Sequence, residues 1–222
     1  MNESIWAIPK EEEMTNDKGA DERQSFIAEA RREQIIEATI ATLDEIGYVN
    51  ASLAQIAKRA GISTPLISYH FSDKNDLINQ TLTTLLSEAN AYVTERLKEG
   101  RTAREKLRIF IEARLAYQGT HSKHNVALIE IVFNARTPDN VPYYKLSDDG
   151  EDPVVYALEQ LLTEGQASGE FREFDIHAMA SAIQGAIGEH LANQCLIAIV
   201  SLETYCAEIF EIFDRATKAD QR

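Results

Sequence analysis

Residues 52–74, SLAQIAKRAGISTPLISYHFSDK, decide the fold, because they carry the pattern of two short helices joined by a glycine turn. Ser52 and Gln55 have the spacing of a capping box at the start of a helix. Gly61 follows that helix, where the chain must turn through a conformation that glycine adopts without steric cost. Ser63 can cap the second helix, with Pro65 in its first turn. Such a helix-turn-helix places its second helix in the major groove of duplex DNA.

Helical segments on both sides strengthen this interpretation, since a bare pair of short helices around a glycine also occurs in proteins that bind no DNA. Upstream, residues 31–47 place apolar side chains on one helical face and end at Gly47. Downstream, residues 73–93 carry an apolar stripe over several turns. The pattern therefore predicts a three-helix DNA-binding head followed by a long fourth helix.

The stretch from about residue 31 to residue 86 resembles the N-terminal domain of the TetR family of bacterial transcriptional regulators. The matching residues follow a fixed order: Ile35-Ile36-Glu37-Ala38, Gly47, Ser52, Ile56-Ala57, Ala60-Gly61-Ile62-Ser63, Tyr69-His70-Phe71, Lys74 and Leu77. One position departs from the family pattern, because Ser68 stands where the family often has an aromatic residue. The base sequence that is read therefore does not transfer from the family.

Positions along the motif predict which side chains meet DNA. The free amides at the helix start beside Ser52 suit a phosphate, and Thr64 at the tip of the second helix suits base edges. Resemblance to the family implies backbone contacts from Tyr69 and His70, although a packed, hydrogen-bonded ring is the alternative for each. Lys74 opens the next helix and should bind a phosphate. We expect DNA contacts from eight residues: Ser52, Ser63, Thr64, Pro65, Ser68, Tyr69, His70 and Lys74.

Net charge is the main argument against DNA binding, since the chain carries −14 at pH 7. The excess is uneven: residues 1–28 carry −4, residues 29–75 carry −1 and the remainder carries −9. Phosphate binding depends on local cations, because exposed charges are screened beyond about 10 Å at ordinary salt. The near-neutral head therefore remains compatible with DNA, with weak non-specific binding.

Length and composition predict an all-α protein with a head and a larger body. The 222 residues are 44% hydrophobic, and strand-type alternation is nowhere sustained. We expect a disordered acidic tail at 1–24, a helix-turn-helix domain at 25–75 and a helical effector-binding and dimerisation domain at 76–222. In the tail, Arg23 is a weak candidate for the minor groove, because the acidic run at 11–13 opposes that role.

The composition also bears on the compartment. No apolar run reaches a membrane-spanning length, and the acidic start has no signal-peptide core. Cys195 and Cys206 lack ligand or framework spacing, which is typical of free thiols in a reducing cytoplasm. We therefore expect a cytoplasmic protein without membrane partners.

The body is expected to contain five further helices, with 125–136 central and buried. Its last two helices, about 175–199 and 201–218, carry apolar faces, and the first of them contains Gly185 and Gly188. Resemblance to the family implies a homodimer that pairs these helices across a two-fold axis and reads a palindromic operator. The alternative is that both helices belong to the monomer's own core.

A regulator needs an input, and the family resemblance implies a small-molecule effector that releases DNA, with repression as its usual outcome. Polar groups that interrupt apolar faces are the better candidates for a pocket. The candidates for effector binding are Tyr117, Phe133, Arg136, Gln184 and His190.

Other classes of function find less support. The chain lacks the nucleophile-elbow, phosphate-loop and dinucleotide-binding patterns of common enzymes, so we expect no enzyme activity and no cofactor. His121 and His124 lie one turn apart, but isolated pairs of this kind are mostly surface residues, and no metal site is expected. The remaining alternative is a helical binding or scaffolding protein whose head has lost its affinity for DNA.

Overall fold

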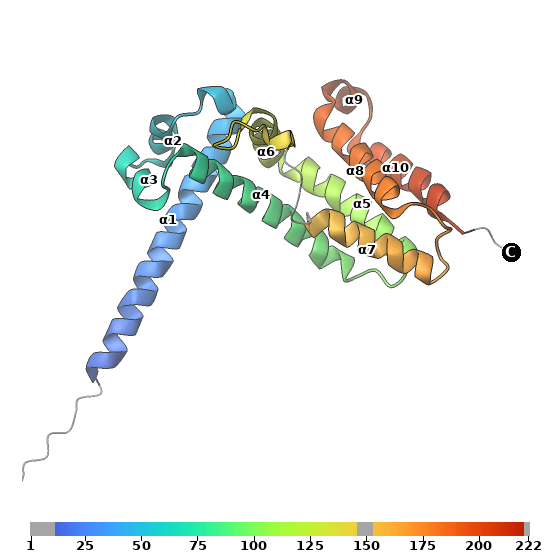
Figure 1. The fold of residues 1–222 in the computed structure, drawn as a ribbon, viewed down its shortest axis with the longest axis horizontal. Coiled ribbons are helices and arrows are strands. Elements are labelled where there is room, and N and C mark those ends of the chain that lie inside the picture. Colours follow the sequence, from blue (N-terminus) through green and yellow to red (C-terminus); the bar gives the residue numbers. More distant parts are fainter. Residues whose placement is uncertain (1–11, 146–152, 220–222) are drawn as a thin grey trace, which may run out of the picture.

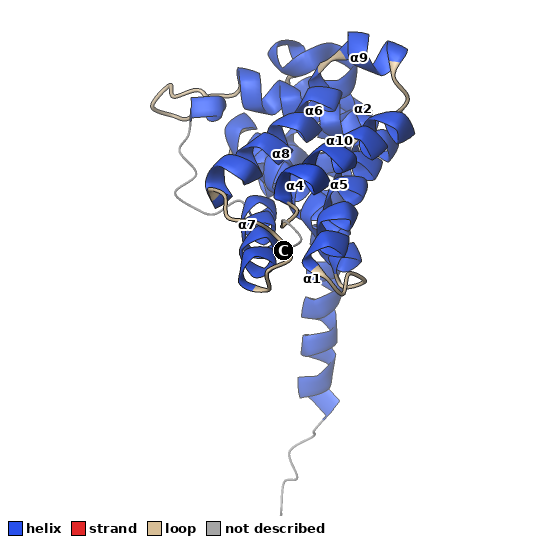
Figure 2. Cartoon of the chain, turned by 90° about the vertical axis from the view of Figure 1, so that its right-hand side faces the viewer, coloured by secondary structure: helices blue, strands red, loops and turns tan. Residues whose placement is uncertain are grey.

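The computed structural model describes residues 12–145 and 153–219, and these ranges are helical as predicted (Figures 1 and 2). No strand occurs in the described ranges beyond two isolated bridges, Arg136 with Pro142 and Phe171 with Lys218. None of the described helices is long and apolar enough to cross a membrane. The elements are α1 Glu12–Asn50, α2 Leu53–Ala60, α3 Thr64–His70, α4 Lys74–Leu97, α5 Ala103–Thr120, α6 Ser122–Asn134, the 3-10 turn η1 Tyr143–Lys145, α7 Pro153–Ala167, α8 Ile176–Ala192, α9 Gln194–Ile199 and α10 Leu202–Thr217.

The first helix starts earlier than the sequence predicted. Helix α1 begins at Glu12, so residues 12–24 form helix where a disordered tail was expected, and this part of α1 projects away from the head (Figure 1). The physical reason is continuity: these residues include helix formers such as Glu, Lys, Ala and Met, and they extend a helix that is already nucleated downstream. The rest of the predicted tail, residues 1–11, lies outside the described residues.

Gly47 ends the regular part of α1, as the sequence predicted. Its backbone has φ 73° and ψ 167°, a conformation outside the helix that favours glycine strongly. A β-carbon at Gly47 would lie 3.2 Å from Oε2 of Glu130 in α6. The turn therefore also brings the end of α1 against the body.

Gly47→Ala should lower the free energy of unfolding by about 1–3 kcal/mol, because an alanine is strained at this φ and ψ. Gly61→Ala is the matched control: its φ is also positive, at 67°, but an added β-carbon would meet nothing within 4 Å. Urea unfolding followed by far-UV circular dichroism measures both. A loss for Gly47→Ala no larger than that for Gly61→Ala would contradict the role of the approach to Glu130.

Two hydrophobic cores divide the molecule, and their border differs from the predicted domain border. One core joins α1–α4 to α6 through Ala127, Ile131 and Ala135. The other joins the far part of α4 to α5, α7, α8 and α10 around residues such as Phe110 and Leu158. Helix α6 therefore belongs by packing to the head, although it lies within the sequence of the body.

Helix α6 also corrects a second expectation, since it is not buried on all sides. Its inner face lies in the head core, while Val126 is exposed and Phe133 is 63% exposed. The sequence of α6 is apolar on nearly all sides, but only one face is buried against α1, while the other face is exposed. Periodicity cannot distinguish these cases, because both faces carry apolar residues.

The predicted long helix over 175–199 is interrupted at Asn193. Helix α8 ends at Ala192, and Asn193 caps α9, which begins at Gln194. The side chain of Asn193 accepts a hydrogen bond of 3.0 Å from the backbone N–H of Leu196 in the first turn of α9. An asparagine side chain that binds nearby backbone amides favours a helix cap over a helix interior. The final helix, α10, agrees with its predicted span to within a residue at each end.

Candidate nucleic-acid interface

Helices α2 and α3 form the predicted helix-turn-helix. Ser52 caps α2: its Oγ accepts from the backbone N–H of Gln55 at 3.3 Å, and Oε1 of Gln55 accepts from the backbone N–H of Ser52 at 2.9 Å. Gly61 adopts the left-handed conformation, and the backbone N–H of Ile62 donates to the carbonyl of Ala57 at 3.0 Å. The capping box of α2 and the glycine turn therefore arise from the residues that predicted them.

The second helix separates a buried face from an open one. Ile67 and Phe71 are buried in the head core, which sets the orientation of α3. Leu66, predicted as buried, is only half-buried, because α3 is short and lies at the edge of the head. Tyr69 lies on the open face with 77% of its surface exposed, so a packed ring is excluded for it. The other predicted contact residues are exposed (Ser52, Ser63, Pro65 and Ser68) or half-buried (Thr64, His70 and Lys74).

The start of α3 leaves polar groups available. Ser63 occupies the N-cap position as predicted, but, contrary to the prediction, its side chain makes no capping hydrogen bond. The hydroxyl of Ser68, by contrast, donates within the helix: its Oγ lies 3.5 Å from the carbonyl oxygen of Thr64, at the limit of a hydrogen bond. The hydroxyl of Ser63 and the exposed residues beside it can therefore turn toward an external acceptor.

His70 lies edge-on to Tyr69, with ring centroids 5.1 Å apart. Burial lowers the pKa of His70 below its usual value, and the nearby guanidinium groups of Arg32 and Arg31 lower that pKa further. The lowered pKa favours the neutral form of the ring near pH 7. The neutral ring can donate one hydrogen bond to a phosphate but brings no charge of its own.

Cations near this face are mostly held by the protein. Lys74 donates from Nζ to the carbonyl of Tyr48 at 3.2 Å and lies over the Tyr48 ring, 4.5 Å from its centroid. Burial lowers the pKa of Lys74. Arg32 donates to Gln80 at 2.7 Å, and Arg59 pairs with Glu45. Tyr48, which the sequence analysis did not single out, thus positions the predicted phosphate-binding lysine.

The predicted effector residues do not come together. Gln184 is half-buried on α8, whereas Phe133 stacks on Tyr144 at 6.0 Å between centroids, in an exposed region that also contains Arg136. Tyr117 lines a small cavity of about 60 Å³, where burial raises the pKa of its hydroxyl to about 12. Only His190 of the five lines a second cavity, which lies between α6 and α8–α9.

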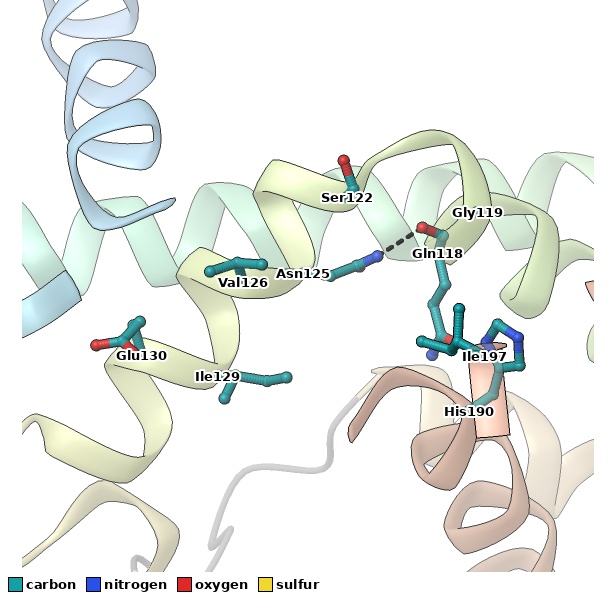
Figure 3. A pocket seen from close by; sticks show the side chains of 9 residues that line it. All are labelled: Gln118, Gly119, Ser122, Asn125, Val126, Ile129, Glu130, His190 and Ile197. Carbon is teal, nitrogen blue, oxygen red and sulfur yellow. Dashed lines mark hydrogen bonds between the residues drawn. The ribbon is translucent and has the colours of Figure 1, made fainter. Parts of the chain in front are cut away.

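That larger cavity has a volume of about 340 Å³ and lies beside the head (Figure 3). Most of its lining residues were not among the predicted effector residues, because they come from separate helices. Its lining residues are Gln118, Gly119, Ser122, Asn125, Val126, Ile129, Glu130, His190 and Ile197.

The two adjacent histidines of the α5–α6 corner have partners within the protein. His121 stacks on Tyr117 with centroids 4.0 Å apart, and His124 lies 3.4 Å from a carboxylate oxygen of Glu88. Over the described ranges, no group of three or more His, Cys, Asp or Glu side chains could hold a metal ion.

The comparisons with known proteins agree with the motif. Residues 35–81 match the sequence model of the family described as bacterial regulatory proteins, tetR family. The chain is 39% identical over 94 residues to the HTH-type transcriptional regulator BetI of Pectobacterium carotovorum subsp. carotovorum (strain PC1), covering 41% of this chain and 48% of that protein. It is 48% identical over 67 residues to BetI of Yersinia pestis (strain Pestoides F), covering 30% and 34%. The matched part spans at most about half the length of these curated relatives.

Solved structures share the fold over most of this chain. The fatty acid degradation regulator FadR of Bacillus halodurans has a TM-score of 0.72 at 21% identity, covering 83% of this chain and 94% of that one. FadR of Bacillus subtilis, solved in complex with stearoyl-CoA, has a TM-score of 0.71 at 24% identity, covering 82% and 96%. At these identities the likeness supports the fold alone.

Proposed function

Because the chain belongs to the TetR family of bacterial regulatory proteins, we propose that it is a DNA-binding transcriptional regulator, acting in the cytoplasm and probing operator DNA with α3. The observation that carries this proposal is the orientation of α3. Ile67 and Phe71 anchor one side of α3 in the head core, and Tyr69 projects from the other side. A fixed helix with an open polar face is what a major-groove contact requires.

The open face suits two kinds of contact. Thr64 stands at the tip of α3, where a side chain reaches base edges and can hydrogen-bond or touch a thymine methyl group. Tyr69, one turn further along, suits the phosphate backbone, which positions the protein without reading sequence. Lys74 adds a phosphate contact with the donors that its bond to Tyr48 leaves free.

Selection of bound fragments from the genome of the source organism tests this division. Thr64→Ala should change which sequence is enriched, whereas Tyr69→Phe should enrich the same sequence with lower recovery, because only a phosphate contact is lost. An equal change in the enriched DNA sequence for both variants would contradict the assignment of Thr64 to base edges and Tyr69 to the phosphate backbone. No enrichment at low salt, even for the unaltered protein, would favour the helical binding or scaffolding protein, which the acidic charge and the internally held cations of the head support.

We further propose a homodimer formed by α8 and α10. Ala178, Ala182 and Gly185 form an exposed strip on α8, and a β-carbon at Gly185 would meet nothing within 4 Å. Ile212 on α10 is also exposed. A two-fold axis through these helices would present two α3 helices to a palindrome, with half-sites about 34–36 Å apart.

Release by a small molecule completes the proposed function, with repression as the outcome. The solved Bacillus subtilis FadR holds stearoyl-CoA, and by analogy the body of this chain binds an effector. Helix α6 supports a coupling between body and head, because it contributes to the head core with one face and to the larger cavity with another. An effector that moves α6 would therefore shift the heads relative to the operator half-sites.

A further inference from the structure

The cavity between α6 and α8–α9 has apolar walls and polar ends. Val126, Ile129 and Ile197 supply aliphatic surface, while Glu130 lies at one end and Gln118 with His190 at the other (Figure 3). Its volume of about 340 Å³ falls within the range of small-molecule sites. The chemistry of its two ends therefore indicates which ligand fits.

Glu130 places a carboxylate at one end of the cavity, and only one of its two oxygens accepts hydrogen bonds in the described structure. Its Oε2 accepts hydrogen bonds from the backbone N–H of Tyr48 at 2.7 Å and from Nδ2 of Asn134 at 3.3 Å. Within the described ranges, no donor is bonded to Oε1 and no cationic side chain pairs with this carboxylate. Glu130 is half-buried, so water compensates its charge only in part.

Gln118 provides an unsatisfied acceptor at the other end. The residue is 9% exposed, and its Oε1 is buried without a hydrogen-bond partner in the described structure. Its side chain extends toward His190 and Ile197 (Figure 3). A buried carbonyl without a donor favours a ligand that donates a hydrogen bond to it, so this end of the cavity does not favour an anion.

We propose that this cavity binds an apolar organic ammonium ion, with the cation at Glu130 and the apolar part along Val126, Ile129 and Ile197. This inference rests on the proposed function and names the effector class for it. The two described acceptors, Glu130 and Gln118, favour donors and positive charge. An anion of equal size would be repelled by Glu130. The oxygen of Gln118 lies beside the apolar end of either ligand, so the two differ only in their interaction with Glu130.

The same carboxylate connects the cavity to the DNA-binding face. The Tyr48 peptide lies between them: its N–H donates to Glu130, and the carbonyl of Tyr48 accepts from Lys74 at 3.2 Å. An ammonium ion at Glu130 competes with the Tyr48 N–H for the carboxylate. Occupancy of the cavity would therefore loosen the turn that holds Lys74 beside the DNA-binding face.

Calorimetric titration of the purified full chain with octylammonium and octanoate tests the ligand class, since the two probes share an alkyl chain and differ in charge. Octylammonium should bind, and octanoate should bind at least about tenfold more weakly. Glu130→Gln keeps an acceptor for Tyr48 but removes the charge, and should weaken octylammonium binding about tenfold or more. Glu112→Gln, which removes a carboxylate outside the cavity, should leave binding unchanged.

Equal binding of both probes, or unchanged octylammonium binding in a Glu130→Gln variant with an unaltered melting curve, would overturn the proposal. If that variant does not fold, the preference of the unaltered protein between the two probes still decides. DNA binding is measured separately: octylammonium should release duplex DNA from the unaltered protein and not from Glu130→Gln. Octylammonium binding by a chain that never binds DNA would refute the proposed function and leave the cation site standing.

Discussion

Tyr69→Ala should lower the affinity for operator DNA by at least about 100-fold while leaving the melting temperature unchanged. Phe71→Ala, two residues away, should instead destabilise the head by about 3–5 kcal/mol. Tyr69 is 77% exposed and packs only edge-on against His70, so its removal mainly deletes one charge-assisted contact of about 1.5–3 kcal/mol in each half-site. Phe71 is fully buried beneath Arg32, and its loss leaves a cavity in the head core.

Fluorescence anisotropy with a selected DNA fragment measures the affinity, and thermal unfolding by circular dichroism measures the stability. Tyr69→Phe is the control, because it keeps the ring and removes only the hydroxyl. Its affinity for DNA should lie between that of the unaltered protein and that of Tyr69→Ala. A destabilised Tyr69→Ala variant would mean that the ring packs in solution, and the assignment of the DNA-facing side of α3 would be wrong.

Arg104→Met should lower the free energy of unfolding by about 2–3 kcal/mol. Arg104, near the start of α5, donates from Nε and Nη2 to the two carboxylate oxygens of Asp214 on α10, at 2.5 and 2.8 Å. Asp214 is only 8% exposed, so removal of the guanidinium leaves a buried charge without a partner. The exposure of Arg104 itself places the loss toward the lower end of the usual range for broken buried pairs.

Arg215→Met is the matched control on the same helix, because Arg215 pairs with Glu211 in an exposed i, i+4 arrangement worth less than about 0.5 kcal/mol. The double variant Arg104→Met with Asp214→Leu should regain most of the lost stability, since it removes the unpaired carboxylate as well. Urea unfolding measures all three. Equal losses for Arg104→Met and Arg215→Met would show that the Asp214 pair does not stabilise the packing of α10 on α5.

Several features of the candidate site could be predicted because short-range interactions determine them. The capping box of Ser52 and Gln55 and the turn at Gly61 involve residues within a few positions of each other. The open and buried faces of α3 follow from helical periodicity over one or two turns. The effector residues could not be predicted in the same way, because a pocket is lined by side chains from several helices, and the sequence does not reveal how those helices pack.

What the sequence determined by itself was therefore the helical class, the helix-turn-helix and the exposure of Ser68 and Tyr69 on α3, since propensity, caps and periodicity act along the chain. Only the tertiary structure decided that α6 packs into the head core and that Glu130 reaches Tyr48, 82 residues earlier in the chain. It also decided that Lys74 is held by the Tyr48 carbonyl. These contacts depend on how separate helices pack, and the apolar faces of α6 were compatible with more than one packing.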